Sequence, residues 1–329
     1  MPFPFQAHLF ALPAKTRQAC VDGLLHRNTH LSPKNFEAWC LQSFGKGIYE
    51  TFLRPYNTKL WGCPPKQLTC EWCNSYVPTP SVREIRQSAI KKPGKKFGYN
   101  AYFYYPQTGG CNALVTALAN HVTQLKTRCA VTQIDLVNKT VRAGGKTISF
   151  DTLVNTLPLP VFLKLLKNNP TLNALAKKLS CQSVTVYQLA LKGKPTPFSW
   201  LYCPDPRDPF YRVGMQSSFS HSLAPQGCYS LYVELPGLAT PGKALARKIE
   251  NALLQKGIIS AKDKKLFGFF TKIPYAYVRY DKNRTTLVKR VTEKLARHRC
   301  FCAGRYGRWE YSFMEKSLLQ GKEIAQKLV

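Results

Sequence analysis

Apolar positions in the middle of the chain follow the two-residue period of strands, interrupted by turns. Residues 130–136, 140–142 and 147–150 are separated by Asn138-Lys139 and Gly144-Gly145. Asn and Gly favour the tight turns of antiparallel hairpins. The pattern therefore predicts a three-stranded meander. Further strands are predicted over residues 102–105, 151–156, 184–191, 211–216, 229–235 and 266–270.

Helical spacing of apolar residues marks other parts of the chain. Residues 1–60 are predicted to be mainly helical, with irregular aromatic and proline-rich segments over a cleft (Phe3, Phe5, Phe52, Pro55, Tyr56 and Trp61). The other expected helices are these: 35–45 ended by Gly45; 82–90; one with Leu114, Leu118, Val122 and Leu125; one capped by Thr240-Pro241 with Leu245, Ile249 and Leu253; one with Leu287, Val291 and Leu295; and a last one with Met314, Leu318, Ala325 and Leu328. Strands and helices together predict an α/β fold.

The closing segment has a more specific pattern. A short apolar run, residues 300–303, leads through Gly304 and Gly307 into the helix expected from Met314. A strand, a glycine turn and a helix N-terminus present backbone N–H groups to an anion. An ordinary strand-to-helix turn explains the same residues equally well.

Composition bounds the class of protein. The 329 residues are 44% hydrophobic, as in globular proteins, and no apolar stretch is long enough to span a membrane. The first residues do not have the pattern of a signal peptide. Twelve cysteines without framework spacing favour a reducing compartment. We therefore expect a cytoplasmic protein.

The net charge of +31, from 48 basic and 17 acidic residues, favours anionic partners. The strongest cluster is Lys91-Lys92-Pro93-Gly94-Lys95-Lys96. No zinc-finger spacing or RNA-recognition motif accompanies it. A diffusely basic surface is thus favoured over a dedicated nucleic-acid site.

Candidate catalytic groups are sparse. Cys70-Glu71-Trp72-Cys73 has redox or zinc spacing but no second pair, so structural cysteines are favoured. The six histidines occur singly, which supports neither a triad nor a metal site. No carboxylate pair stands out. An enzyme with this sequence would rely on a cofactor.

Several motifs occur together in this chain. They are the Gly109-Gly110 helix, the meander, an Asp-x-Leu-Val-x-Thr-x-Pro strand at 151–158, the closing Gly-Arg-Tyr-Gly, Pro2-Phe3-Pro4-Phe5-Gln6, and Pro55-Tyr56-Asn57-Thr58-Lys59-Leu60-Trp61. Together, over nearly the whole chain, they resemble the FAD-dependent amine oxidase and protoporphyrinogen oxidase superfamily, in the branch of UDP-galactopyranose mutase. The resemblance implies FAD and a partial FAD/NAD(P)-binding domain interleaved with a mixed α+β substrate domain.

It also implies site residues, although the catalytic residue stays unknown and flavin N5 is the expected reacting atom. Cofactor contacts would come from Gly109, Gly110, Gly304, Arg305 and Met314. A small-molecule substrate, in the mutases a nucleotide sugar, would meet Phe3, Phe5, Gln6, Asn57, Trp61, Asn100, Arg212, Tyr275 and Tyr311. No metal ligand is implied.

The implied domains are a helical substrate-side region (1–97), the rest of the FAD-binding domain (98–160), a mixed-sheet substrate domain (161–298) and the closing FAD-binding segment (299–329). Two departures from the family pattern stand out. Tyr76 occupies the place of a diphosphate-binding arginine, which weakens the mutase interpretation. The glycine-rich Rossmann unit is missing, so a truncated or split gene is expected over a functional standalone protein. That unit would be carried by a separate polypeptide or encoded upstream of the assigned start.

Three functions follow from these observations. The leading hypothesis is an FAD-dependent, amine-oxidase-like oxidoreductase. The alternative is an isomerase similar to UDP-galactopyranose mutase. The third is a flavin-free remnant or a basic binding module, which the charge supports.

Overall fold

The computed structural model describes residues 3–30, 32–98 and 101–328. They form two compact units, residues 1–121 with 182–276 (unit 1) and residues 122–181 with 277–329 (unit 2). The four domain boundaries expected from the sequence stay a prediction. None of the helices in the described ranges is both long and apolar enough to cross a membrane.

Unit 1 begins with a helical region. Its helices are α1 (Ala14–Leu25), α2 (Phe36–Ile48), a π-helical turn (Tyr49–Leu53), α3 (Arg54–Trp61), α4 (Cys73–Tyr76), α5 (Val82–Ser88) and α6 (Asn112–Ala119). Asn35 caps α2 by accepting a hydrogen bond from the backbone N–H of Ala38 at 2.9 Å. The expectation of irregular segments was wrong for Phe52, Pro55, Tyr56 and Trp61, which lie in helical turns.

Helices α1 and α2 pack closely against each other at positions occupied by glycine. A Cβ on Gly47 would lie 2.1 Å from the Ala19 carbonyl oxygen, and one on Gly23 would lie 2.5 Å from the Gly47 nitrogen. Gly45 interrupts the helical backbone of α2 with a φ of 75°, as its sequence position predicts, but α2 continues to Ile48. Only glycine fits at this crossing because backbone atoms occupy the Cβ positions.

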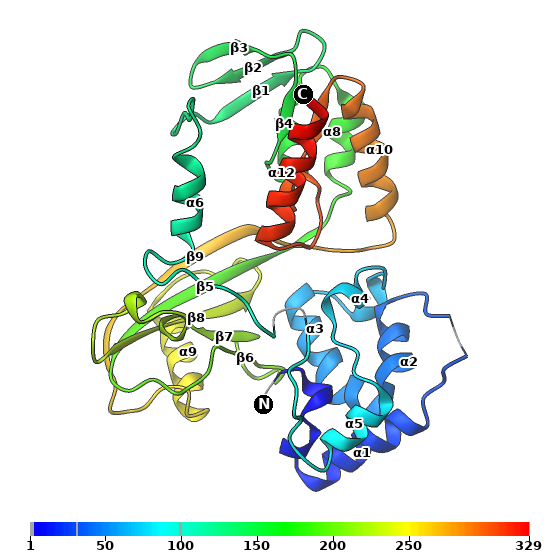
Figure 1. Cartoon of the computed structure of the whole chain (residues 1–329), viewed down its shortest axis with the longest axis vertical. Coiled ribbons are helices and arrows are strands. Elements are labelled where there is room, and N and C mark those ends of the chain that lie inside the picture. Colours follow the sequence, from blue (N-terminus) through cyan, green and yellow to red (C-terminus); the bar gives the residue numbers. More distant parts are fainter. Residues whose placement is uncertain (1–2, 31, 99–100, 329) are drawn as a thin grey trace. The chain divides into compact units, whose positions relative to one another are not determined.

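The rest of unit 1 is a five-stranded sheet in the order β6-β7-β8-β5-β9. Its strands are β5 (Cys181–Lys192), β6 (Trp200–Tyr202), β7 (Arg212–Met215), β8 (Cys228–Pro236) and β9 (Lys264–Val278); β5 begins, and β9 ends, with residues of unit 2. Helix α9 (Lys243–Gln255) lies against this sheet (Figure 1). Its Ile249 and Leu253 pack in one core with Leu231 and Val233 of β8. This helix begins after Gly242, so the predicted cap at Thr240-Pro241 was wrong.

Unit 2 contains the predicted meander of β1 (Val131–Asp135), β2 (Thr140–Ala143) and β3 (Lys146–Ser149), paired antiparallel in chain order. Its second sheet pairs β4 (Leu153–Asn155) in parallel with β10 (Cys300–Cys302). The helices are α7 (Leu159–Leu165), α8 (Pro170–Ala176), α10 (Arg284–Ala296), α11 (Gly304–Gly307) and α12 (Met314–Leu328).

Three local predictions were wrong. Residues 102–105 form no strand; their side chains are exposed or half-buried. Helix α6 ends at Ala119, so Val122 and Leu125 lie beyond it, and its apolar stripe is exposed. Helix α12 buries Gln320 and Ile324 instead of the predicted stripe of Met314, Leu318 and Leu328.

Candidate functional site

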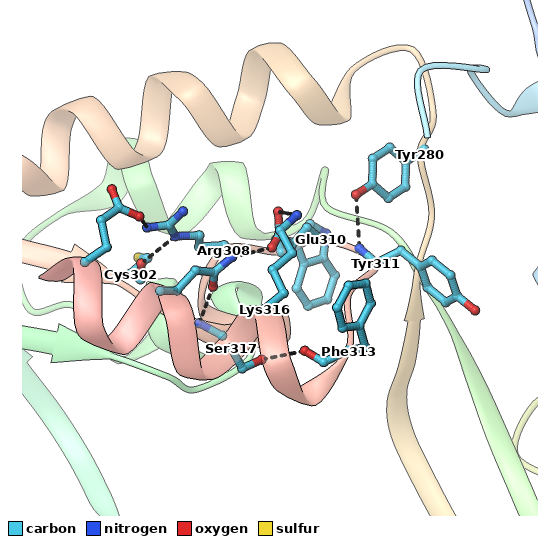
Figure 2. A network of polar contacts seen from close by, with 12 residues as sticks. Tyr280, Cys302, Arg308, Glu310, Tyr311, Phe313, Lys316 and Ser317 are labelled. Atoms are coloured by element: carbon cyan, nitrogen blue, oxygen red, sulfur yellow. Dashed lines mark hydrogen bonds and ion pairs between the residues drawn. The ribbon is translucent and has the colours of Figure 1, made fainter. Parts of the chain in front are cut away.

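The segment between β10 and α12 is held tightly in unit 2. The backbone N–H of Gly304 donates to Gln320 Oε1 at 2.8 Å, and Gln320 Nε2 donates to Glu310 Oε1 at 2.6 Å. Arg308 donates from Nε to the Cys302 carbonyl at 3.2 Å (Figure 2). The one buried amide of Gln320 therefore fixes both ends of the turn, which explains why this polar residue faces inward.

Glycine is required at Gly307 for packing. A Cβ at Gly307 would lie 2.3 Å from the carbonyl oxygen of Asn155, at the end of β4. Gly304 differs: its φ is 72°, and the nearest atom to a Cβ there is Ser317 Oγ, 3.9 Å away. Gly304 thus presents bare backbone with space beside it, as a flat ligand would need.

Arg305 lies between two tyrosine rings of unit 2. Its guanidinium carbon is 5.1 Å from the Tyr277 ring and 5.0 Å from the Tyr311 ring. The backbone N–H of Tyr311 donates to Tyr280 Oη at 3.0 Å (Figure 2). Cation–π attraction and this hydrogen bond together hold Arg305 and Tyr311, two residues that the sequence predicts at the site.

Ser312 adds a polar atom to the same segment. Its side chain is 6% exposed, and its Oγ has no hydrogen-bond partner among the described atoms. A buried hydroxyl without a partner costs free energy unless a ligand or water satisfies it. Met314, the other predicted contact here, is 56% exposed at the start of α12.

The loop Gly109-Gly110 lies in unit 1. Both residues have positive φ, 77° and 62°. The Gln107 carbonyl before them accepts hydrogen bonds from the Ser220 and Ser222 hydroxyls. A Cβ on Gly109 would meet only Ala113, at 3.2 Å, whereas one on Gly110 would meet Leu223 and the Tyr105 hydroxyl. Gly109 is therefore the exposed member and Gly110 the packed one.

Aromatic rings connect the start of the chain to α3 and β6. Phe5 stacks on Phe52 at 4.8 Å, and Phe52 stacks on Tyr56 at 5.3 Å. Tyr202 meets both Tyr56, at 4.9 Å, and Phe3, at 5.0 Å. The structure thus brings Phe3 and Phe5 into one cluster with residues that sequence reasoning did not assign to the site.

Polar residues predicted to meet a substrate are engaged within unit 1. Asn57 is buried; its Nδ2 donates to the Leu53 carbonyl at 2.8 Å, and its Oδ1 accepts from Trp61 Nε1 at 3.2 Å. Gln6 is buried too and donates to the Pro78 carbonyl. Trp61 is only 1% exposed. These contacts stabilise the helical region itself.

Arg212 is paired with a carboxylate. Its Nε donates to Glu234 Oε1 at 3.0 Å, and the Tyr211 hydroxyl donates to Glu234 Oε2 at 2.6 Å. Tyr275 is half-buried on β9, and Asn100 lies outside the described residues. The charge of Arg212 is therefore largely balanced by Glu234.

Sequence reasoning missed the role of Lys59. Its Nζ donates to the carbonyls of Cys203, Asp205 and Phe210 at 3.1, 2.6 and 2.7 Å. Burial lowers the pKa of Lys59, although Asp208, Cys203 and Asp205 act in the opposite direction. A lysine inside the Pro55-to-Trp61 motif was the available signal. No group of His, Cys, Asp or Glu within the described ranges is placed to hold a metal ion.

Comparison with solved structures shows which known folds this chain resembles. Reduced UDP-galactopyranose mutase matches 100% of this chain and 76% of its own, with a TM-score of 0.92 and 27% identity. A protein from Exiguobacterium sp. 255-15, assigned as a protoporphyrinogen oxidase, matches 96% of this chain and 72% of its own at 12% identity, with a TM-score of 0.67. The chain has the fold of the amine oxidase-like superfamily.

A putrescine oxidase variant extends the comparison within this superfamily. It matches 100% of this chain and 76% of its own, at 9% identity and a TM-score of 0.60. No protein-family model matches the sequence. The α/β fold expected from the resemblance is thus confirmed, and the individual site residues stay predictions.

Proposed function

We propose that this amine oxidase-like chain acts as an FAD-dependent oxidoreductase. The observation that carries the proposal is the similarity of the entire chain to UDP-galactopyranose mutase at a TM-score of 0.92. FAD, when bound, would supply a flavin ring that accepts a hydride from the substrate.

Residues of unit 2 fit such a group. Gly304 offers open backbone at a positive φ of 72°. Ser312 Oγ offers a buried hydroxyl without a partner among the described atoms. Arg305 offers a cation that Tyr277 and Tyr311 hold in place. These residues would orient the ring and balance negative charge on it.

The ADP half of FAD would be bound by a further strand–helix unit that packs on the sheet of β4 and β10. Support comes from the sheet of β4 and β10, whose strands have three residues each and leave Val154 41% exposed. Parallel sheets are normally covered on both faces and contain more strands. A further parallel strand with its helix would extend and cover the sheet of β4 and β10.

A flavin titration tests the proposal. We expect the purified chain to bind FAD weakly alone and more tightly when the glycine-rich unit of a mutase is added in trans. Flavin absorbance and quenching of flavin fluorescence report binding. A Ser312→Ala variant should weaken binding, and Ser75→Ala, in α4 of unit 1, is its control. Absence of flavin binding with and without the added unit would refute the proposal.

A mutase-like isomerase is the second candidate, because the mutase is matched at a TM-score of 0.92 against 0.67 and 0.60 for the two oxidases. Tyr76 and the Arg212–Glu234 pair count against it, since a diphosphate needs uncompensated cations. Turnover of UDP-galactopyranose by the flavin-loaded chain under dithionite would favour the mutase. Flavin reduction by another substrate, without that turnover, would favour the oxidoreductase.

A further inference from the structure

The lysine cluster after α5 lines two adjoining cavities of unit 1. The larger, of about 520 Å³, is lined by Lys92, Lys95, Lys96 and several aromatic rings. The smaller, of about 330 Å³, lies against α5 and also includes Lys91. Lys92 and Lys95 line both cavities. The sequence shows a run of charge, and the structure adds a concave surface beneath it.

The surface keeps most of its positive charge. Among the described residues that line the two cavities, Glu84 is the one carboxylate, and it is paired with Lys95. This pairing, together with hydrogen bonds from Ser81, lowers the pKa of Glu84 to about 2. Within the described residues, Lys92 and Lys96 form no ion pair. The cavity walls thus carry excess cations that an anionic ligand would neutralise.

His8 does not add to this charge. It is buried beside the larger cavity, and its Nδ1 lies 2.8 Å from the Pro4 carbonyl. Burial lowers the pKa of His8, and Lys92 lowers it further. The attraction for anions therefore comes from the lysines, and it should not change near neutral pH.

Aromatic rings form another wall of the larger cavity. Phe103 and Trp200 lie 5.8 Å apart by ring centroids, and Phe103 is 51% exposed. Just outside, Lys96 Nζ lies 4.4 Å from the ring of Tyr102, which is 77% exposed, and Tyr104 is fully exposed. Exposed rings interleaved with lysines are how proteins bind single-stranded nucleic acid, since bases stack on the rings and lysines contact phosphates.

We propose that this surface, the groove lined by Lys92, Lys95, Lys96 and Phe103, binds single-stranded nucleic acid. Two cavities in series offer room for more than one nucleotide, and lysines line both. The net charge of +31 favours a polyanion over a mononucleotide, because nonspecific attraction increases with the number of phosphates within reach. The proposal does not depend on flavin binding.

The test measures fluorescence anisotropy of a labelled deoxythymidine oligonucleotide about 12 residues long, within the range covered by one binding groove. Affinity should fall as salt rises. In the Lys92→Gln/Lys96→Gln variant the slope of log affinity against log salt should decrease by about 1.4, or about 0.7 for each lost phosphate contact. The control variant Lys177→Gln/Lys178→Gln removes the same charge from exposed residues after α8 and should retain the wild-type slope.

A second variant tests stacking without changing charge. Phe103→Ala should weaken oligonucleotide binding about tenfold or more, and circular dichroism would show that the fold is retained. Leu118→Ala, a truncation of an exposed side chain on α6, is its control. Equal losses in the groove and control lysine variants would show that binding is diffuse, and would overturn the proposal. So would binding that does not depend on oligonucleotide length and is fully displaced by uridine monophosphate, which would indicate a mononucleotide site.

Discussion

Lys59 should contribute more to the stability of unit 1 than any exposed lysine. Lys59→Met keeps most of the aliphatic stem but removes the ammonium, and leaves the carbonyls of Cys203, Asp205 and Phe210 without this donor. Hydrogen bonds to a charged donor contribute about 1.5 kcal/mol or more each. Burial of the ammonium, which also lowers the pKa of Lys59, offsets part of the stabilisation from these three hydrogen bonds. We expect a net loss of about 3 kcal/mol.

Denaturant unfolding followed by tryptophan fluorescence measures this loss. Four of the five tryptophans, residues 39, 61, 72 and 200, lie in unit 1, so the signal reports mainly on that unit. Lys66→Met, on the exposed turn after α3, is the matched control and should change stability by less than about 0.5 kcal/mol. If the two variants unfold at the same denaturant concentration, the three hydrogen bonds do not stabilise the unit and the reasoning is refuted.

Two further predictions concern glycines and thiols. Gly47→Ala should destabilise the chain by about 3 kcal/mol or more, because the new Cβ would overlap the Ala19 carbonyl. Gly321→Ala, which has open space around it in α12, should stabilise the chain by about 0.5–1 kcal/mol. Thermal unfolding of both variants measures these opposite changes. Burial raises the pKa of the Cys203 thiol to about 11 and that of Cys300 to about 12, above the ordinary 9.0. At pH 8, alkylation followed by mass spectrometry should therefore modify exposed Cys111 first. The unfolded chain loses these thiol protons near pH 9, whereas the folded chain keeps them to about pH 11. The contribution of the two thiols to the stability of the fold should therefore be fully present below pH 9 and be lost as the pH rises above it. Equal labelling of Cys111 and Cys300 would contradict the assignment.

Turn residues and the spacing of apolar residues predicted those elements that depend only on residues near one another in the chain. Lys139, Gly144 and Gly145 have the positive φ that the meander turns require, and the helix from Met314 begins where expected. The failures depended on tertiary contacts. Residues 102–105 have strand-like aromatics, yet no described strand pairs with them.

The same limit applies to the candidate site. The motif containing Asn57 and Trp61 was visible in the sequence, but their mutual hydrogen bond and burial were not. Glu234, which balances Arg212, is 22 residues away from it along the chain and forms no motif with it. Likewise, Gln320 faces inward on α12 because its side chain forms hydrogen bonds with Gly304 and Glu310. The spacing of apolar residues cannot reveal such contacts. Residue types thus predicted the candidates, and only packing showed their partners.

The parallel pairing of β4 with β10 has a consequence for the order of assembly during translation. Asn155 and Cys302 are 147 residues apart, a distance that a ribosome covers in on the order of ten seconds. Every residue of unit 1 is made before Cys300, since that unit ends at Ala276. Unit 1 can therefore fold on the ribosome, while β4 waits for its partner strand. A nascent chain stalled before residue 300 should show a protease-resistant unit 1 and a degraded segment between residues 122 and 181.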